Sequence, residues 1–263
     1  MDHITLASRD YEFNDHSIKA LEIDEDPSGL LRGGVGSTIW DAGIVLAKFL
    51  ERSNVLALAV ATAAADSNTT VNVLELGAGT GIVGLAVARM LSAKNRMARI
   101  VLTDKDNVVL LLQRNVEKNR SNGVDIEARV LDWEAVSGIK VAASLPAADG
   151  ARTQLESVSS SSIDPAVTDN HELLDTEWDL VILSDCIWVP ALYPPLIGTI
   201  NTIIKSDRTE LVIAFEKRSF AEEMEFFAML GKTFRFSDIK PKDQDADYQS
   251  EDIYLFKCQR RTQ

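Results

Sequence analysis

From residue 71 onward, apolar runs of strand length alternate with segments whose apolar residues recur at helical spacing. Residues 71–76 form a β-branched and leucine-rich run that ends at a glycine, and residues 82–91 follow with helical periodicity. The same alternation predicts further strands and helices, with strands at 100–103, 126–131, 178–184 and 211–215 and helices beginning at 106, 192 and 220. Apolar strands separated by helices are typical of a parallel sheet that is buried on both faces.

The end of the chain has a different pattern. Residues 233–239 and 253–257 are both strand-like, and only a polar loop lies between them. A connection without a helix favours antiparallel pairing. We therefore predict an α/β fold, a mostly parallel seven-stranded sheet with a C-terminal antiparallel hairpin.

The pattern also predicts the domain organisation. Residues 1–32 are expected to form an N-terminal extension and 33–263 a single domain. A low-complexity insertion rich in alanine, serine and aspartate interrupts it at about 138–177; a solvated loop is favoured over a regulatory or binding segment. Ahead of the sheet, Ser37 or Thr38 can cap a helix, with Trp40 at the edge of its apolar stripe.

Composition narrows the function classes. The formal net charge of −13 and the pI near 4.7 disfavour a nucleic-acid substrate and favour basic partners. The two cysteines, Cys186 and Cys258, form no CxxC pair, and we find neither a metal-ligand cluster nor an apolar run of membrane-spanning length. We expect a monomer without a metal or a membrane, located in the cytoplasm and also in the nucleus.

One glycine-rich stretch, "VLELGAGTGIVG" from Val73, fits two cofactor signatures at once. Residues 79–84 satisfy the dinucleotide pattern G-x-G-x-x-G, while Glu75, Gly77 and Gly79 fit the loop of an S-adenosylmethionine (SAM) methyltransferase. In both cases Asp104, after the next strand, would take the ribose hydroxyls. The loop alone leaves both cofactors open.

Residues around the loop favour SAM. The carboxylate of Glu75 would face the amino-acid half of SAM, whereas it would repel a diphosphate. Asp132 offers a carboxylate to an adenine amino group and Trp133 a flat ring to cover the base, which suits either cofactor. The predicted antiparallel hairpin favours a methyltransferase, because dinucleotide folds normally continue their parallel winding.

Several segments, taken in their order along the chain, resemble the motifs of a known family. These are "WDAGIVLAKFLE", "VLELGAGTGIVGL", "LTDKDNVVLLLQRNVEKN", "VLDW", "SDCIW" and "DYQSEDIYLFK". They follow the motifs of the seven-stranded protein-lysine methyltransferases of the methyltransferase-like 21 group, which have the Rossmann-like class I fold. "GGVGSTIWDA" and "YQSEDI" are most similar to the members that methylate a hexameric AAA ATPase of the valosin-containing protein type.

The resemblance implies roles for individual residues. The positions that contact SAM in the family are matched by Trp40, Gly77, Ala78, Gly79, Asp104, Trp133 and Ser184. Asp185 begins the D-x-x-Y motif at the substrate lysine, but the tyrosine of that motif is replaced here by Trp188. An aromatic wall for the ammonium group is kept, and a hydroxyl is lost.

The expected activity is methyl transfer to the ε-amine of a lysine in a protein. This reaction depends mainly on positioning, and Asp185 would capture and aim the lysine without being a strong general base. A helix cap is the alternative for Asp185. Two other functions stay open, namely a nicotinamide-dependent oxidoreductase and a non-catalytic binding module. Glu216 and Lys217, after the fifth strand, receive no role.

Overall fold

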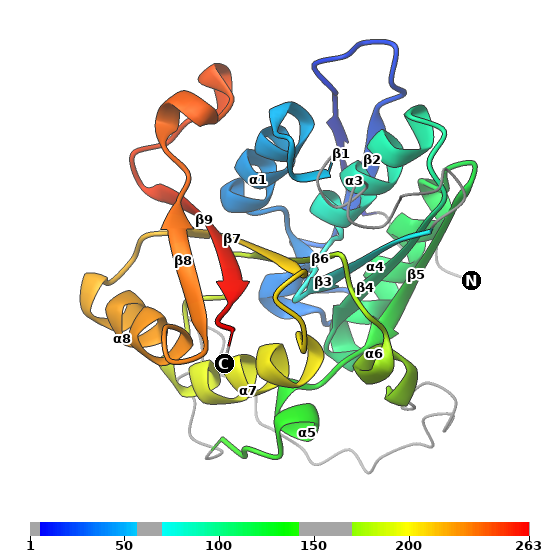
Figure 1. Ribbon diagram of the computed structural model, residues 1–263. Helices are drawn as coiled ribbons and strands as arrows, with labels where there is room; N and C mark the ends of the chain where they lie inside the picture. Colours follow the sequence, from blue (N-terminus) through cyan, green and yellow to red (C-terminus); the bar gives the residue numbers. More distant parts are fainter. Residues whose placement is uncertain (1–5, 57–69, 142–169, 263) are drawn as a thin grey trace.

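The computed structural model describes residues 6–56, 70–141 and 170–262. Its centre is a seven-stranded sheet in the order β5-β4-β3-β6-β7-β9-β8 (Figure 1). The parallel strands are β3 (Val71–Leu76), β4 (Ala98–Asp104), β5 (Val124–Val130), β6 (Leu180–Ser184) and β7 (Glu210–Glu216). The last two strands, β8 (Phe234–Asp238) and β9 (Ile253–Arg260), run antiparallel, with β9 between β7 and β8. The predicted fold class and its terminal hairpin are confirmed.

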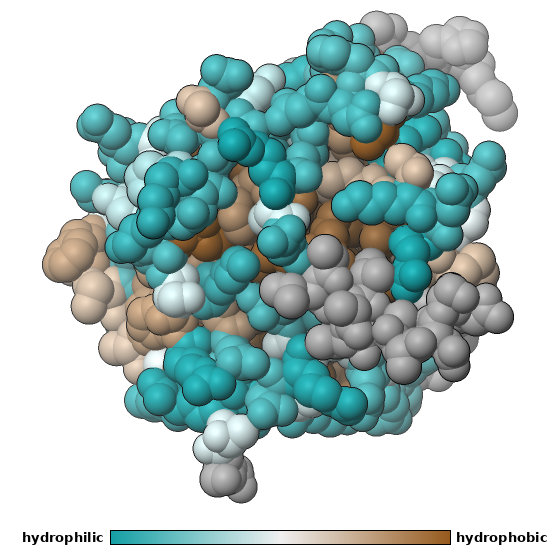
Figure 2. Space-filling view, turned by 45° about the horizontal axis from the view of Figure 1, so that its top comes forward, coloured by the Kyte–Doolittle hydropathy of each residue, from teal (hydrophilic) through white to brown (hydrophobic). Residues whose placement is uncertain are grey.

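Helices cover both faces of this sheet, as Figure 1 shows. One face packs against α1 (Asp41–Arg52), α3 (Ile82–Ala93) and α4 (Asp106–Lys118). The other face packs against α5 (Trp133–Ser137), α6 (His171–Asp175), α7 (Tyr193–Ile203) and α8 (Phe220–Leu230). Strand side chains alternate between the two cores: Val73 belongs to the first, and Leu74 and Leu76 belong to the second. Hydrophilic side chains cover most of the face in Figure 2.

The predicted N-terminal extension contains an antiparallel hairpin that the sequence pattern did not reveal. Its strands are β1 (Ala7–Tyr11) and β2 (Leu21–Glu25), and Leu21 and Ile23 of β2 are fully buried. A 3-10 turn, η1 (Gly34–Ser37), then leads to α1. The predicted cap at Ser37 or Thr38 is wrong, because α1 begins at Asp41 with Trp40 in the cap position.

A buried lysine joins the hairpin to α1 and to the loop before β9. Lys48 of α1 donates to the carbonyl of Glu12 at 2.5 Å and pairs with Glu51 at 3.0 Å. Its ammonium lies over the ring of Tyr11 at 4.7 Å and over the ring of Tyr248 at 4.9 Å. Tyr248 lies in η5 (Ala246–Tyr248), which follows η4 (Pro241–Asp243). The segment "YQSEDI" thus begins at this contact.

Most of the predicted insertion at 138–177 lies outside the described residues, which resume at 170. The last part of it is described: residues 171–175 form α6, and Leu173 is fully buried. The carbonyl of Leu173 accepts a hydrogen bond from the indole of Trp178 at 3.0 Å. Within the described ranges, no helix is long and apolar enough to cross a membrane.

Candidate active site

The chain reverses its winding direction between β3 and β6, and this reversal fixes the place of the site. β4 and β5 lie on one side of β3, whereas β6 and β7 lie on the other. Leu76 of β3 pairs with Leu183 of β6, so the turns that follow these two strands start side by side. Ligands of open α/β sheets bind at such a switch point, outside the carboxyl ends of the strands.

The turn after β3 needs glycines. Gly77, Gly79 and Gly81 have φ values of +65°, +56° and +83°, in the left-handed region that favours glycine. A Cβ atom on Gly77 would lie 2.6 Å from Cys186 Sγ and 3.2 Å from the ring of Trp133. Between the glycines, the buried Ala78 donates its backbone N–H to the carbonyl of Thr103 at 2.9 Å. The loop therefore packs between the end of β4 and the turn after β6.

Asp104 ends β4 beside this loop, as predicted. Its Oδ2 accepts the backbone N–H of Gly79 at 2.8 Å, and its Oδ1 accepts that of Lys105 at 2.7 Å. Burial raises the pKa of this carboxyl, and the two hydrogen bonds oppose that effect. The side chain is half-buried, and each carboxylate oxygen has a second lone pair for a ligand hydroxyl.

Glu75 lies deeper than the other predicted cofactor residues. It is fully buried on β3, and its Oε2 accepts the backbone N–H of Gly84 in α3 at 2.8 Å. Its Oε1 has no hydrogen-bond partner among the described residues. Burial, with a smaller effect of the Asp104 charge, raises the pKa of Glu75 to about 8. Its contact with a cofactor stays a prediction.

Gly84 has a packing role. A Cβ atom there would lie 2.1 Å from Leu102 Cδ2 and 2.7 Å from Glu75 Oε2. The third glycine of the dinucleotide pattern is thus required by the close approach of α3 to the sheet.

Asp132 and Trp133 follow β5 at the same edge. Asp132 is exposed, and its carboxylate caps α5 by accepting the backbone N–H of Glu134 at 2.8 Å. Trp133 is half-buried, with its ring against Gly77 and the core under α7. The Trp133 carbonyl accepts the hydroxyl of Thr199 at 3.2 Å, which anchors this turn to α7.

Trp40 and Ser184 lie on the α1 side of the edge. Trp40 is 43% exposed, and its indole N–H donates to the carbonyl of Val35 at 2.9 Å. Ser184 ends β6 and approaches α1 closely, because a Cβ on Gly43 would lie 3.5 Å from Ser184 Oγ. The turn η1 reaches the glycine loop, since a Cβ on Gly79 would lie 3.1 Å from the carbonyl oxygen of Gly36.

Asp185 follows β6 and does not cap a helix; the alternative interpretation is wrong. Its backbone is left-handed, with φ +53°, and its side chain is only 5% exposed. Both carboxylate oxygens are bound by Arg218, Nη1 to Oδ1 and Nη2 to Oδ2, at 2.7 Å each. Asp185 Oδ1 also accepts the backbone N–H of Glu216 at 3.1 Å. The guanidinium of Arg218 lies 5.6 Å over the ring of Trp40.

Sequence reasoning missed Arg218 and the position of Cys186. Arg218 follows β7 by two residues, so its place at the carboxyl edge was the only available signal. The Cys186 thiol is buried 3.4 Å from the carbonyl oxygen of Leu76, and burial raises its pKa well above the usual value. The thiol therefore stays protonated and packs against the glycine loop. Trp188, two residues on, is 39% exposed.

The described part of the chain contains no group of three or more His, Cys, Asp or Glu side chains that could hold a metal ion. The side chains at the edge instead suit an organic ligand. They combine a glycine turn, an indole ring and carboxylates on neighbouring strand ends.

Comparisons with known proteins identify the family. A family model described as lysine methyltransferase matches residues 16–143 and 152–233. The protein-lysine N-methyltransferase EFM6 of Saccharomyces cerevisiae is 27% identical, over 97% of this chain and 92% of that protein. The protein N-lysine methyltransferase METTL21A of Mus musculus is 26% identical, over 99% and 90%. The EEF1A lysine methyltransferase 3 of Xenopus tropicalis is 22% identical, over 86% and 76%.

Proposed function

The chain belongs to the lysine methyltransferase family whose model it matches over most of its length, and we propose that it transfers methyl groups from SAM to a lysine ε-amine in a protein substrate. One observation carries the proposal. The glycine loop and Asp185 lie side by side, because Gly77 packs against Cys186, the residue after Asp185. The predicted cofactor loop thus adjoins the predicted lysine site.

The residues at the edge fit SAM. The half-buried carboxylate of Asp104 suits the ribose hydroxyls, and the ring of Trp133 beside Gly77 suits the adenine. The buried Glu75 Oε1, which lacks a partner among the described residues, suits a donor from the amino-acid half. Trp40, Ala78, Asp132 and Ser184 complete the predicted set at this edge.

The chain's own residues would hold and orient the lysine. SAM supplies a methyl group on a sulfonium, whose positive charge lowers the pKa of a nearby amine. Asp185 would attract the ammonium, and Trp188 would offer an aromatic face to it. A carboxylate favours the charged amine, and removing the proton at pH 7 costs about 4–5 kcal/mol for a pKa of about 10.4. We therefore propose that Asp185 binds and orients the substrate lysine, and that the ammonium loses its proton to water.

The test is methyl labelling of a cell extract with labelled SAM, read by mass spectrometry. The wild-type protein should label a discrete protein on lysine, and Asp185→Ala should abolish the label while calorimetry still detects SAM binding. Asp175→Ala, which removes an exposed carboxylate on α6, is the control and should label normally. Undiminished labelling by Asp185→Ala would remove Asp185 from the reaction. Binding of NAD in place of SAM would overturn the proposal.

For the substrate, we propose a hexameric AAA ATPase of the valosin-containing protein type. Two segments support this choice, "GGVGSTIWDA" and "YQSEDI". The first contains η1, which contacts the glycine loop, and the second begins at Tyr248 against Lys48. The net charge of −13 suits a basic target surface.

A second substrate class is elongation factor 1A, which is favoured by the name of the Xenopus tropicalis relative, EEF1A lysine methyltransferase 3. Purified ATPase and purified elongation factor, incubated separately with the enzyme and labelled SAM, distinguish the two. Lysine methylation of the elongation factor alone would overturn the ATPase proposal and leave the proposed activity standing.

A further inference from the structure

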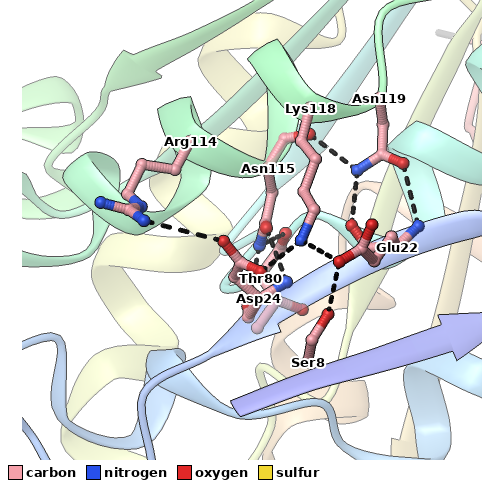
Figure 3. A network of polar contacts seen from close by, with 8 residues as sticks. All are labelled: Ser8, Glu22, Asp24, Thr80, Arg114, Asn115, Lys118 and Asn119. Atoms are coloured by element: carbon pink, nitrogen blue, oxygen red, sulfur yellow. Dashed lines mark hydrogen bonds and ion pairs between the residues drawn. The ribbon is translucent and has the colours of Figure 1, made fainter. Parts of the chain in front are cut away.

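Two asparagines one helical turn apart attach the N-terminal hairpin to α4 (Figure 3). Asn115 accepts the backbone N–H of Asp24 at 2.8 Å and donates to the carbonyl of Asp24 at 3.0 Å. Asn119 makes the same pair of bonds with Glu22, at 3.0 and 2.9 Å. The spacings match, because four helical residues rise about 6 Å and two strand residues about 6.7 Å. The two amides thus pair with one edge of β2.

The two asparagines differ in their third hydrogen bond. Asn119 Nδ2 also donates to the carbonyl of Asn115, within α4, at 2.9 Å. Asn115 Nδ2 instead donates to the carbonyl of Thr80, in the glycine loop, at 2.9 Å. Both amide hydrogens of Asn115 are therefore used, one on the hairpin and one on the loop.

The glycine loop is consequently held from two sides. On one side Asp104 accepts the N–H of Gly79, and on the other Asn115 donates to Thr80, the next residue. Asn115 is fully buried, with 0% of its surface accessible, and Thr80 is 2% exposed. Movement of Asn115 away from the loop would leave buried polar groups without partners.

Ion pairs also link the hairpin to α4, but nearer the surface. Lys118 pairs with Glu22 at 2.5 Å and with Asp24 at 2.6 Å, and Arg114 lies 3.9 Å from Asp24. These pairs involve partly exposed side chains and do not touch the glycine loop. Among the contacts in Figure 3, only those of Asn115 reach both the hairpin and the loop.

We propose that Asn115 is a positioning residue that couples docking of the N-terminal hairpin to the shape of the cofactor loop. The inference rests on the proposed function, because it takes the loop to bind SAM. Coupling between two sites is reciprocal: a docked hairpin favours SAM binding, and bound SAM favours the docked hairpin by the same factor.

The asparagines provide a matched pair of variants for calorimetry. Asn115→Ala and Asn119→Ala each remove two bonds to β2 and one further bond. Asn115→Ala should weaken SAM binding about tenfold, within the usual range of coupling, and Asn119→Ala less than about twofold. Circular dichroism checks that both variants are folded. If Asn115→Ala is not, Asn115→Asp replaces it, with Asn119→Asp as its partner, because aspartate keeps the accepting oxygen and loses the donors.

Hydrogen exchange of the β2 amides, residues 21–25, gives a second readout without turnover. SAM should slow this exchange in the wild-type protein and in Asn119→Ala, but not in Asn115→Ala. Equal weakening of SAM binding in both variants, or no weakening in Asn115→Ala, would overturn the coupling. Unchanged exchange in a wild-type protein that binds SAM would also overturn it. A wild-type protein that binds no SAM would instead refute the proposed cofactor itself.

Discussion

Arg218 binds the carboxylate of Asp185 through both of its terminal nitrogens, in a parallel arrangement with two distances of 2.7 Å. Asp185 is the residue predicted to receive the substrate lysine. Its two oxygens are already engaged by Arg218 and by the backbone of Glu216. A lysine ammonium that reaches Asp185 must therefore compete with a cation supplied by the chain itself.

Replacement of Arg218 by alanine should lower the KM for the protein substrate. A charge-assisted hydrogen bond contributes about 1.5–3 kcal/mol, so removal of the competing cation should lower KM roughly tenfold. The same change should lower the melting temperature, because the buried carboxylate loses its partner. Steady-state kinetics with the substrate identified by labelling measure the effect.

Arg208→Ala is the control for that experiment, because Arg208 pairs with the exposed Glu177 away from the edge. It should leave KM unchanged. A raised KM in Arg218→Ala would mean that Arg218 stays on Asp185 during turnover and positions it.

Glu75 should make the free energy of unfolding depend on pH. Its pKa is raised from 4.5 to about 8 in the folded protein, so the folded state holds this proton more tightly than the unfolded chain. The stabilising contribution is complete below pH 4.5 and is lost as pH rises toward 8. The slope is at most about 1.4 kcal/mol per pH unit. Denaturant unfolding of wild type and Glu75→Gln, from pH 5 to 8, measures it.

The variant should gain stability relative to wild type as pH rises, because glutamine does not ionise. Parallel curves for the two proteins across that range would contradict the prediction.

Gly84→Ala and Gly77→Ala should separate packing from cofactor binding. Alanine at 84 would push its Cβ into Leu102, and such overpacking costs about 1–3 kcal/mol, partly offset by a helix-propensity gain of about 1 kcal/mol. The new Cβ would also lie 2.7 Å from Glu75 Oε2, so SAM affinity should fall, but much less than in Gly77→Ala, where the loop itself is strained. Alanine at 77 would be strained at φ +65°, at about 1–2 kcal/mol, and would clash with Cys186 Sγ.

For Gly77→Ala we expect loss of SAM binding, measured by calorimetry beside thermal unfolding. If Gly84→Ala lost SAM binding while keeping its melting temperature, the assignment of Gly84 to packing would be refuted.

Trp188 should act through its ring. An exposed cation–π contact is worth about 0.5–1 kcal/mol, and about 2 kcal/mol or more when desolvated. Trp188→Ala should therefore raise the substrate KM severalfold, whereas Trp188→Tyr, which restores the family's residue, should keep activity. Methylation kinetics with both variants test this, and equal loss of activity in both would show that indole itself is required.

The strands of the sheet and the main helices that cover it were largely predictable from the sequence, because the strands are continuous apolar runs and the helices have apolar residues at helical spacing. The predicted helix at 220, for example, is observed at Phe220–Leu230. The β1–β2 hairpin was not predicted: β2 does alternate between buried and more exposed residues, but four of the five residues of β1 are exposed and carry no alternating pattern that would mark a partner strand. The hairpin is held in place by hydrogen bonds from side-chain amides of α4, which lie almost a hundred residues away in the sequence.

The candidate site likewise contains residues that local sequence predicts and residues whose placement depends on distant parts of the chain. The glycine loop and Asp104 follow from local sequence, because strand ends and glycine spacing mark them. The pairing of Asp185 with Arg218 joins the turns after two different strands, 33 residues apart, and no local pattern encodes it. Likewise, the burial of Glu75 under α3 depends on how closely that helix approaches the sheet.

The position of β9 between β7 and β8 constrains the order of folding. β8 pairs only with β9 within the described residues, so it cannot join the sheet until β9, which comes later in the chain, has formed. The sheet therefore cannot grow one strand at a time in chain order. β8 can join only together with β9 or after it, and until β9 pairs with β7 the edge of β7 stays open to pairing with other chains.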